Sequence, residues 1–234
     1  MAVPAGGEAR TLWTRAANRT MCDAMARGYF ITLEGGEGAG KSTQAALLSE
    51  RLKQTGHSVV QTREPGGTPG AEKIRSLLVE GDTDRWSATT ETLLMYAARR
   101  DHIERVIAPA LARGAVVVCD RYADSTRAYQ GAAGDAPKDL IDGLEAAVLG
   151  DARPDLTLVF DLPVEIGLAR TVARAGGERR FEAKDPGFHA RLRSAFLDIA
   201  QSEPKRCDVI DASADAETVE RAVWACVARR LARP

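Results

Sequence analysis

Gly35-Gly36-Glu37-Gly38-Ala39-Gly40-Lys41-Ser42 decides the fold, because this stretch fits the phosphate-binding pattern G-x-x-x-x-G-K-[ST]. It follows an apolar run, Tyr29 to Leu33, and precedes a segment of helical periodicity that begins at Thr43. Glycines let backbone N–H groups surround an anion, and the dipole of the following helix favours negative charge at the same point. The pattern predicts a P-loop in which Lys41 reaches the β- and γ-phosphates of a nucleotide and Ser42 holds Mg²⁺.

The composition is that of an ordinary globular chain. The chain has 234 residues, a formal net charge of -1 and 44% hydrophobic residues, so one full core is expected. The near-zero charge gives no indication of nucleic-acid or membrane-surface binding, and no apolar run approaches the roughly 20 residues of a membrane helix. The scattered cysteines predict reduced thiols, a cytoplasmic location and no structural metal.

Residues 1–27 have few large apolar side chains and no hydrophobic period, so we expect a disordered N-terminal extension. A transit peptide and an upstream start codon remain alternative explanations, since Met21 and Met25 lie close to the first strand. Residues 28–234 are predicted to form a single domain.

Strands and helices alternate along the rest of the chain. The apolar runs predict further strands at Ser58–Thr62, Ala115–Cys119, Asp155–Asp161 and Cys207–Ile210. Helical periodicity predicts helices at Ala71–Val79, Glu91–Arg113 (bent at Pro109), Leu140–Leu149, Val164–Arg174 and around Val219–Val227. This order predicts a three-layer α/β fold, with a five-stranded parallel sheet flanked by helices.

Two polar segments follow predicted strands, where ligands bind in α/β sheets. The first is the turn-rich loop Arg63-Glu64-Pro65-Gly66-Gly67-Thr68, whose Glu64-Pro65 bond is a candidate cis peptide. The second begins with Asp120-Arg121-Tyr122, and an Asp at this position in P-loop enzymes orders Mg²⁺ or its water.

These segments, in order after this P-loop, resemble bacterial thymidylate kinases. The resemblance is carried by Arg63-Glu64-Pro65-Gly66-Gly67 and by the run from Asp120-Arg121-Tyr122 through Ala123-Asp124-Ser125-Thr126-Arg127-Ala128-Tyr129-Gln130-Gly131. It extends from about Gly28 to the C-terminus. It implies a P-loop kinase with a short mobile lid at about 174–186, and a reaction in which Mg·ATP phosphorylates thymidine 5′-monophosphate (dTMP).

The resemblance also implies roles for individual residues. Arg63, Arg75 and Arg121 match positions that hold the acceptor phosphate, and Pro65 and Ser125 lie beside them in the two motifs. Planar guanidinium groups suit that task. A phosphate monoester is already ionised near neutral pH, because its second pKa is about 6, so no strong general base is expected.

The acceptor nucleoside has matching positions too. Arg99 matches the arginine that contacts O4 of thymine, while Thr126 and Gln130 match residues that read its other polar atoms. Tyr129 matches a ring that disfavours a ribose, and Glu37 matches the carboxylate that accepts the sugar 3′-hydroxyl. Glu64 is an alternative partner for Arg63. The family is commonly homodimeric, and the helix around Glu91–Arg113 is the expected contributor.

The chain departs from the family pattern at two positions. Met95, with Tyr96 beside it, replaces the phenylalanine that usually stacks on thymine, and a thioether can pack against a ring. The lid has Arg179-Arg180-Phe181-Glu182 where Asp-Arg-x-Glu is common. Because the variable P-loop positions Gly36 to Ala39 carry no basic residue, an arginine from the lid is expected to complete the site.

Three other functions are compatible with a P-loop. One is a kinase for another nucleoside monophosphate. Another is a regulatory nucleotide-binding module, against which the chain has no [NT]-K-x-D motif and no D-x-x-G after its third strand. A nucleotide-binding protein without turnover is disfavoured by the intact Lys41, Ser42 and Asp120.

Arg174 and Arg180 are the candidates for an arginine finger over ATP, a role that contributes a factor of about 10³ to 10⁵ in related phosphoryl transfers. We expect an Ala substitution at one of them to lower kcat strongly and to change the Michaelis constant for dTMP little. Steady-state kinetics of both variants test this expectation. Near-wild-type kcat in both would contradict it.

Overall fold

The computed structural model describes residues 27–82, 84–173 and 179–232. Its centre is one parallel sheet with the strand order β2-β3-β1-β4-β5. The strands are β1 (Phe30–Gly35), β2 (Val59–Arg63), β3 (Val116–Asp120), β4 (Leu156–Asp161) and β5 (Cys207–Asp211). The predicted five-stranded parallel sheet is therefore confirmed. The predicted extension 1–27 lies, except for Arg27, outside the described residues, and the domain bounds stay a prediction.

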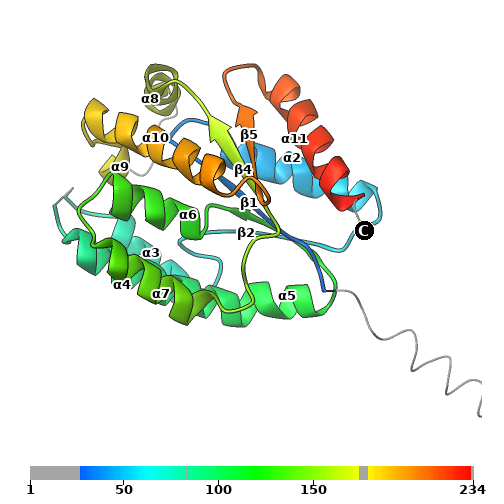
Figure 1. Cartoon of the computed structure of the whole chain (residues 1–234), viewed down its shortest axis with the longest axis horizontal. Coiled ribbons are helices and arrows are strands. Elements are labelled where there is room, and N and C mark those ends of the chain that lie inside the picture. The colour runs from blue at the N-terminus through cyan, green and yellow to red at the C-terminus, as the bar shows by residue number, and fades with distance from the viewer. Residues whose placement is uncertain (1–26, 83, 174–178, 233–234) are drawn as a thin grey trace, which may run out of the picture.

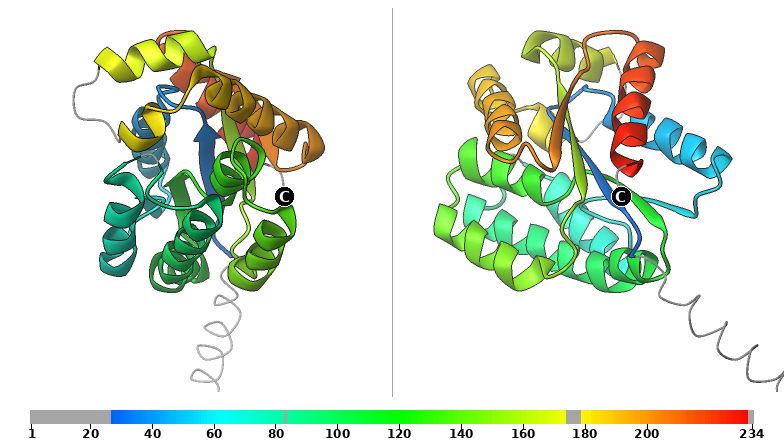
Figure 2. Two further views of the ribbon diagram at one scale, coloured as in Figure 1. Left: turned by 90° about the vertical axis from the view of Figure 1, so that its left-hand side faces the viewer. Right: turned by 45° about the vertical axis from the view of Figure 1, so that its right-hand side comes forward.

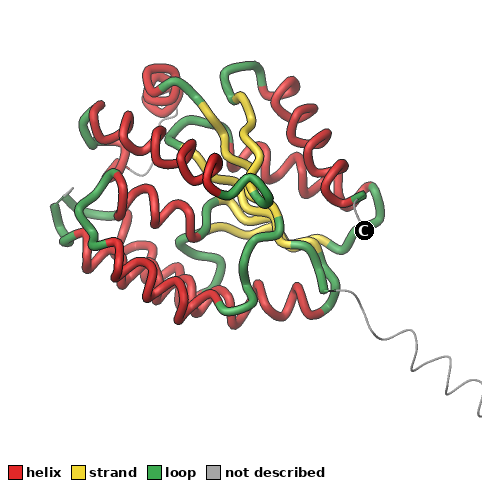
Figure 3. The backbone as a smooth tube through the Cα atoms, viewed as in Figure 1, coloured by secondary structure: helices red, strands yellow, loops and turns green. Residues whose placement is uncertain are grey.

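The helices surround this sheet on both faces, as Figure 3 shows with the strands in yellow between the red helices. Those that precede β3 are α2 (Lys41–Gln54), α3 (Pro69–Val79), α4 (Ala88–His102), the π-helix η1 (Ile103–Ile107) and α5 (Ala108–Ala112). The later ones are α6 (Ala123–Thr126), the π-helix η2 (Arg127–Ala132), α7 (Lys138–Leu149), α8 (Val164–Ala173), α9 (Arg179–Glu182), α10 (Pro186–Ser202) and α11 (Ala216–Leu231). None of these helices is both long enough and apolar enough to cross a membrane.

The register of the sheet brings the P-loop and the second motif together. β1 pairs in parallel with β3 and β4, and its Leu33 is the partner of Asp120. The P-loop that follows β1 and the segment that follows Asp120 therefore leave the sheet side by side, at its carboxyl edge. This edge is where ligands bind in open α/β sheets.

One face of the sheet is covered by α2 and α11, which lie together in Figures 1 and 2. Alternate residues of β4 point to this face, since side chains in a strand have a period of two. Leu158 and Phe160 pack there with Leu48 of α2 and Val223 of α11, and all are buried. This apolar layer holds α2, the helix that follows the P-loop, against the sheet whose strand β1 precedes the loop.

The opposite face is covered by α4, η1, α5 and α7 near β3, and by α10 near β4 and β5. Phe30, Val117 and Cys119 face the first group, whereas Val159 faces α10. Between these two apolar clusters, Thr32, Glu34 and Thr157 form a buried polar strip. The strip lies directly beneath the second motif.

Two features differ from the sequence prediction. The helix predicted from Glu91 to Arg113 is interrupted by the π-helix η1, one turn before Pro109, which lacks the N–H that a regular helix needs there. The long helix α10 was not predicted. Its sequence does carry the signals, with Asp185 capping the Phe188 N–H at 3.0 Å, Pro186 in the first turn, and Phe188, Leu192 and Phe196 at helical spacing.

Leu158 offers a test of the packing described above. Because its side chain is fully buried in the central sheet, we expect Leu158→Ala to lower the free energy of unfolding by about 2–5 kcal/mol. Urea unfolding followed by circular dichroism measures the loss. The matched control is Leu47→Ala on α2, where the side chain is 41% exposed; equal losses in the two variants would contradict this account of the core.

Candidate active site

The P-loop adopts the conformation that its glycines predict. Gly38 and Gly40 have φ angles of 68° and 80°, in the left-handed region that favours glycine, and α2 begins at the next residue, Lys41. A Cβ atom on Gly38 would lie 2.2 Å from the carbonyl oxygen of Gly167 in α8, so the loop also packs directly on the backbone of that helix. The loop can therefore turn its N–H groups toward an anion.

Lys41 and Ser42 lie where the motif predicts. The Lys41 ammonium donates to the Gly36 carbonyl at 2.6 Å, and burial, together with the nearby Arg121, lowers the pKa of Lys41 to about 8. The Ser42 hydroxyl donates to the Asp120 carboxylate at 2.5 Å. These two side chains bring hydroxyl and carboxylate oxygens together at the start of α2, and such hard oxygen ligands are those that Mg²⁺ prefers.

Arg121 connects the two motifs. Its φ angle of 69° is unusual for a residue other than glycine, and it directs the side chain back across the P-loop. The guanidinium group donates to the Gly35 carbonyl at 3.0 Å and to Glu37 at 3.2 Å, and it lies 4.9 Å from the centre of the Tyr129 ring. A fixed cation thus lies beside the phosphate-binding loop.

Glu37 points from the P-loop toward Arg121 and Tyr129. Its carboxylate accepts a short hydrogen bond from the Tyr129 hydroxyl as well as the bond from Arg121. Burial opposes ionisation of Glu37, but the positive charges of Arg121 and Lys41 outweigh it and hold the pKa of Glu37 below its usual value. Glu37 is therefore an ionised acceptor at neutral pH.

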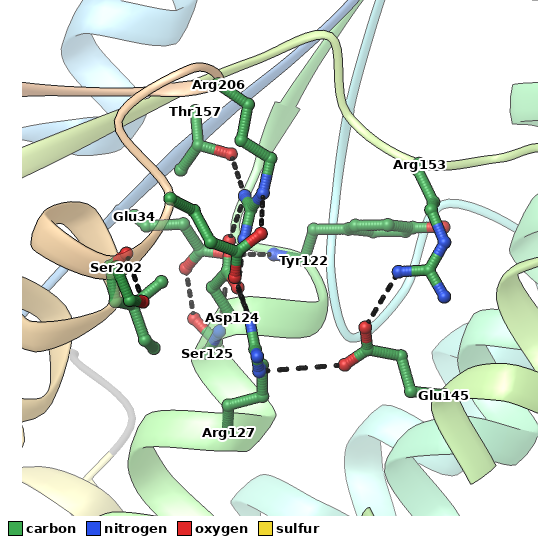
Figure 4. A network of polar contacts seen from close by, with 12 residues as sticks. Glu34, Tyr122, Asp124, Ser125, Arg127, Glu145, Arg153, Thr157, Ser202 and Arg206 are labelled. Carbon is green, nitrogen blue, oxygen red and sulfur yellow. Dashed lines mark hydrogen bonds and ion pairs between the residues drawn. The ribbon is translucent and has the colours of Figure 1, made fainter. Parts of the chain in front are cut away.

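A buried carboxylate supports the backbone that carries Arg121. Glu34, at the end of β1, accepts from the Tyr122 N–H at 2.8 Å and from the Ser125 hydroxyl at 2.6 Å, as the close-up in Figure 4 shows. Beside it, Asp124 is bound by Arg206, which also donates to Thr157. Burial and the negative charge of Asp124 raise the pKa of Glu34 to about 7.

A second buried group holds the loop after β2. Glu64 accepts from Nε of Arg99 at 2.7 Å and pairs with Nδ1 of His102 at 3.0 Å. Arg99 is 2% exposed, donates through Nη2 to Thr126 at 3.1 Å, and has an Nη1 with no hydrogen-bond partner in the described part of the chain. Since a buried donor is costly to leave unpaired, Nη1 is available for a ligand.

Most of the predicted residues line one pocket of about 400 Å³. The predicted residues in its wall are Glu37, Gly38, Ala39, Gly40, Lys41, Ser42, Thr43, Arg63, Pro65, Arg75, Met95, Arg99, Asp120, Arg121, Ser125, Thr126, Tyr129 and Gln130. Gly35, Gly36, Tyr96 and Arg180 were also predicted for the site, but they do not line this pocket. A single cavity of this size can hold a nucleotide next to the P-loop.

The loop Arg63–Thr68 has the predicted cis Glu64-Pro65 bond, and it places two further arginines at the pocket. Arg63 pairs with Glu72 at 3.1 Å, so the predicted bracing of Arg63 by Glu64 is wrong. Glu64 is instead buried between Arg99 and His102. Arg75 donates to the carbonyl of Pro65, which ties α3 to this loop.

Met95 and Tyr96 have different surroundings in the structure. Met95 lines the pocket, whereas Tyr96 is 1% exposed and packs in the core beside the Arg99 guanidinium, 4.7 Å from its ring centre. Neighbouring residues of a helix point about 100° apart, and here Met95 faces the pocket while Tyr96 faces the core. The prediction that Tyr96 binds substrate is therefore corrected, and Met95 stays as the candidate.

The predictions for the two lid arginines, Arg174 and Arg180, have different outcomes. Arg174 lies outside the described residues. Arg180 is 2% exposed and forms an ion pair with Glu91, while it also donates to the carbonyls of Asp82 and Leu78 at 2.9 and 3.0 Å. These contacts direct its guanidinium group to the connection between α3 and α4, away from the P-loop. Its assignment as an arginine finger stays a prediction, which requires the Glu91 pair to break.

Glu34, His102 and Glu91 also support the site but were not predicted from the sequence. Only Glu91 had a readable signal, because it precedes Met95 and Arg99 by one and two turns on the same face of α4. Phe181 and Glu182 of α9 also line the pocket, and the Phe181 ring packs edge-on against Tyr129 at 5.5 Å. A short helix within the predicted lid segment thus forms part of the pocket wall.

The fold and this pocket define a P-loop phosphotransferase that accepts a second anionic substrate beside the nucleotide site. A family model described as thymidylate kinase matches residues 33–223. The chain belongs to the thymidylate kinase family, and the resemblance noted in its sequence is confirmed.

Curated relatives and a solved structure agree with this membership. The chain is 64% identical over 207 residues to the thymidylate kinase of Caulobacter vibrioides, covering 88% of this chain and 99% of the relative. It is 53% identical to that of Nitrobacter hamburgensis, covering 88% and 90%. The crystal structure of thymidylate kinase from Ehrlichia chaffeensis has a TM-score of 0.70 and 35% identity, covering 86% and 99%. The chain is therefore a kinase of this family.

The buried Glu34 predicts a specific pH dependence of stability. Because its pKa rises from an ordinary 4.5 to about 7 on folding, the folded state binds more protons than the unfolded state between these values, and stability falls as pH rises through that window. From about pH 5 to about pH 8, wild type should lose about 2–3 kcal/mol more free energy of unfolding than Glu34→Gln.

Urea unfolding at both pH values measures the difference between the two proteins. Glu50→Gln, at a mostly exposed carboxylate of α2, is the control and should follow wild type. Equal pH dependence in wild type and Glu34→Gln would contradict the assignment.

Proposed function

We propose that the chain transfers the γ-phosphate of ATP to dTMP, giving thymidine diphosphate and ADP. The observation that carries the proposal is one pocket whose wall contains both the P-loop and the full set of polar groups expected to hold a thymidine nucleotide. The donor is assigned to the P-loop side and the acceptor to the side formed by α4, α6 and η2.

On the donor side, backbone N–H groups of the P-loop and the Lys41 ammonium would bind the phosphates. Ser42 and Asp120 would hold Mg²⁺, directly or through water. Their oxygen atoms fit this ion, and the described residues contain no cluster of three His, Cys, Asp or Glu side chains, as suits a metal held mainly by phosphates and water. When bound, the ion would neutralise charge on the β- and γ-phosphates.

On the acceptor side, Arg63, Arg75 and Arg121 would hold the dTMP phosphate. The phosphate is its own nucleophile once ionised, so the residues need only to orient it and neutralise charge. Arg121 is best placed for both phosphates, because its guanidinium group lies beside the P-loop and is fixed by Gly35 and Glu37. Ser125 and Pro65 complete this part of the wall.

The nucleoside would lie between Glu37 and α4. Glu37 would accept a hydrogen bond from the 3′-hydroxyl, and the ring of Tyr129, whose hydroxyl donates to Glu37, would crowd a 2′-hydroxyl. The unpaired Nη1 of Arg99 can donate to thymine O4, and Thr126 and Gln130 line the pocket beside it. Met95 would pack against the ring in place of an aromatic side chain.

The remaining assignments rest on the resemblance. We expect a cytoplasmic enzyme without nucleic-acid or membrane partners, with Arg174 or Arg180 reaching ATP. We also expect a homodimer, which the exposed Leu77 of α3 and Leu93 of α4 support, because these helices pack against each other and leave apolar surface. Sedimentation at micromolar concentration tests the oligomeric state.

A coupled ADP assay with a panel of nucleoside monophosphates tests the reaction. The proposal expects kcat/KM for dTMP to exceed the values for uridylate and guanylate by a wide margin. Comparable turnover of either of them would overturn the substrate assignment, and no turnover of any monophosphate would overturn the activity.

Arg121 provides the sharpest prediction for this reaction. We expect Arg121→Ala to lower kcat/KM for dTMP by about 10² or more, because the variant loses a fixed cation beside two phosphates. Arg121→Lys should recover only part of the activity, since an ammonium group cannot bind bidentately. The control is Arg221→Ala on α11, an exposed arginine that does not line the pocket and should keep wild-type kinetics; a similar loss there would point to a general effect of removing charge.

A further inference from the structure

The amide of Gln130 lies between the pocket and a buried ion pair. Gln130 is 2% exposed and lines the pocket, and its Nε2 donates to Oε2 of Glu91 at 3.1 Å. Its Oε1 has no hydrogen-bond partner among the residues that the structure describes. One end of the amide is therefore occupied, and the other is available to a ligand.

The chemistry of Glu91 determines which end of the Gln130 amide faces Glu91 and which end is left for the pocket. A carboxylate can only accept hydrogen bonds, whereas an amide has a donor end and an acceptor end. With Glu91 ionised, the Gln130 amide must turn its NH₂ group to Glu91, and its oxygen is the atom left for the pocket. A buried amide oxygen without a partner then selects for a ligand that donates a hydrogen bond.

Arg180 holds Glu91 in the orientation in which Glu91 accepts from Gln130. The guanidinium group of Arg180 pairs with Oε1 of Glu91, the oxygen that Gln130 does not use. Arg180 is itself held by the carbonyls of Leu78 and Asp82, so the cation cannot leave Glu91 without breaking several bonds. The charge on Glu91 and the geometry of its two oxygens are thereby set from the side opposite the pocket.

We propose that Glu91, held by Arg180, is a specificity-determining positioning residue that turns the Gln130 oxygen toward N3 of the base. Thymine and uracil carry a proton on N3 and can donate to this oxygen. Cytosine has an unprotonated N3, which would face the oxygen as a second acceptor. The inference rests on the proposed function, which places the base next to Gln130.

Glu91→Gln should invert the amide of Gln130. Arg180 offers only donors, so it would keep the oxygen of the substituted side chain and leave the new NH₂ group facing Gln130. Gln130 would then turn its own oxygen to this NH₂ group and present its NH₂ group to the base. A donor in this position suits N3 of cytosine and opposes N3–H of thymine.

The test is kcat/KM of purified wild type and Glu91→Gln for dTMP, dUMP and dCMP. We expect the ratio of dTMP to dCMP to fall roughly tenfold or more in Glu91→Gln. Part of the preference should remain, because Arg99 would still favour O4 over the amino group of cytosine. The ratio of dTMP to dUMP should not change, since these two bases have the same polar edge.

The fall in the ratio of dTMP to dCMP separates this role from a merely structural one, because general damage would lower all three values together and leave both ratios unchanged. Glu104→Gln, the same substitution at an exposed residue further along the same helical stretch, is the control and should retain the wild-type ratios. A ratio of dTMP to dCMP that stays within threefold of wild type in Glu91→Gln overturns the proposal.

A double-mutant cycle tests the route of the effect. Gln130→Met keeps the length of the side chain but has no amide to turn, so adding Glu91→Gln to it should leave the ratio of dTMP to dCMP unchanged. A further fall in this background overturns the proposal, because Glu91 would then act by another path.

A second variant is available if Glu91→Gln is too unstable to purify. Glu91→Met/Arg180→Met replaces the whole buried pair by apolar side chains, a change that proteins often tolerate, and it leaves the Gln130 amide without its fixed partner. The ratio of dTMP to dCMP should again fall, and an unchanged ratio overturns the proposal. Failure of the proposed function would look different, because wild type itself would then show no preference for dTMP.

Discussion

The carboxylate of Glu34 is the interaction on which the arrangement of the site depends. It lies at the end of β1, directly before the P-loop, and binds the backbone N–H of Tyr122, directly after Arg121. One buried group therefore joins the strand that leads into the P-loop to the segment that carries Arg121. The same carboxylate also accepts from the hydroxyl of Ser125, so both of its oxygens are fixed by the segment that follows Arg121.

The two halves of the pocket are held by different means. On the P-loop side, the positions of the cationic groups follow from backbone geometry and from the mutual pairing of Arg121 and Glu37. On the base side, they follow from buried side-chain pairs, in which Glu64 fixes Arg99 and Glu91 fixes Gln130. Both pairs leave a single polar atom without a partner among the described residues, the Arg99 Nη1 and the Gln130 Oε1. A ligand that satisfied both atoms would need an acceptor and a donor side by side, as on the O4–N3 edge of thymine.

The sequence was sufficient for the fold and for most of the pocket wall, because these depend on local patterns. The P-loop, the apolar strands and the order of the elements predicted the parallel sheet, and the two motifs predicted the residues that meet at its edge. The partners of buried charged groups were not predictable. Glu64 was paired with its neighbour Arg63 in the sequence argument, but its real partners, Arg99 and His102, lie on α4 and are brought close only by tertiary packing. For the same reason, the ion pair between Arg180 of α9 and Glu91 of α4 was not predictable from the sequence.

The contact between Gly38 and Gly167 has a mechanical consequence. The P-loop touches α8 backbone to backbone, since a Cβ atom on either glycine would overlap the carbonyl of the opposing segment. Such a contact contains no rotamers that could absorb a small displacement. Any shift of the loop when an anion enters is therefore passed directly to α8, the helix that precedes the predicted lid segment. The P-loop and the part of α8 around Gly167 thus behave as one rigid unit.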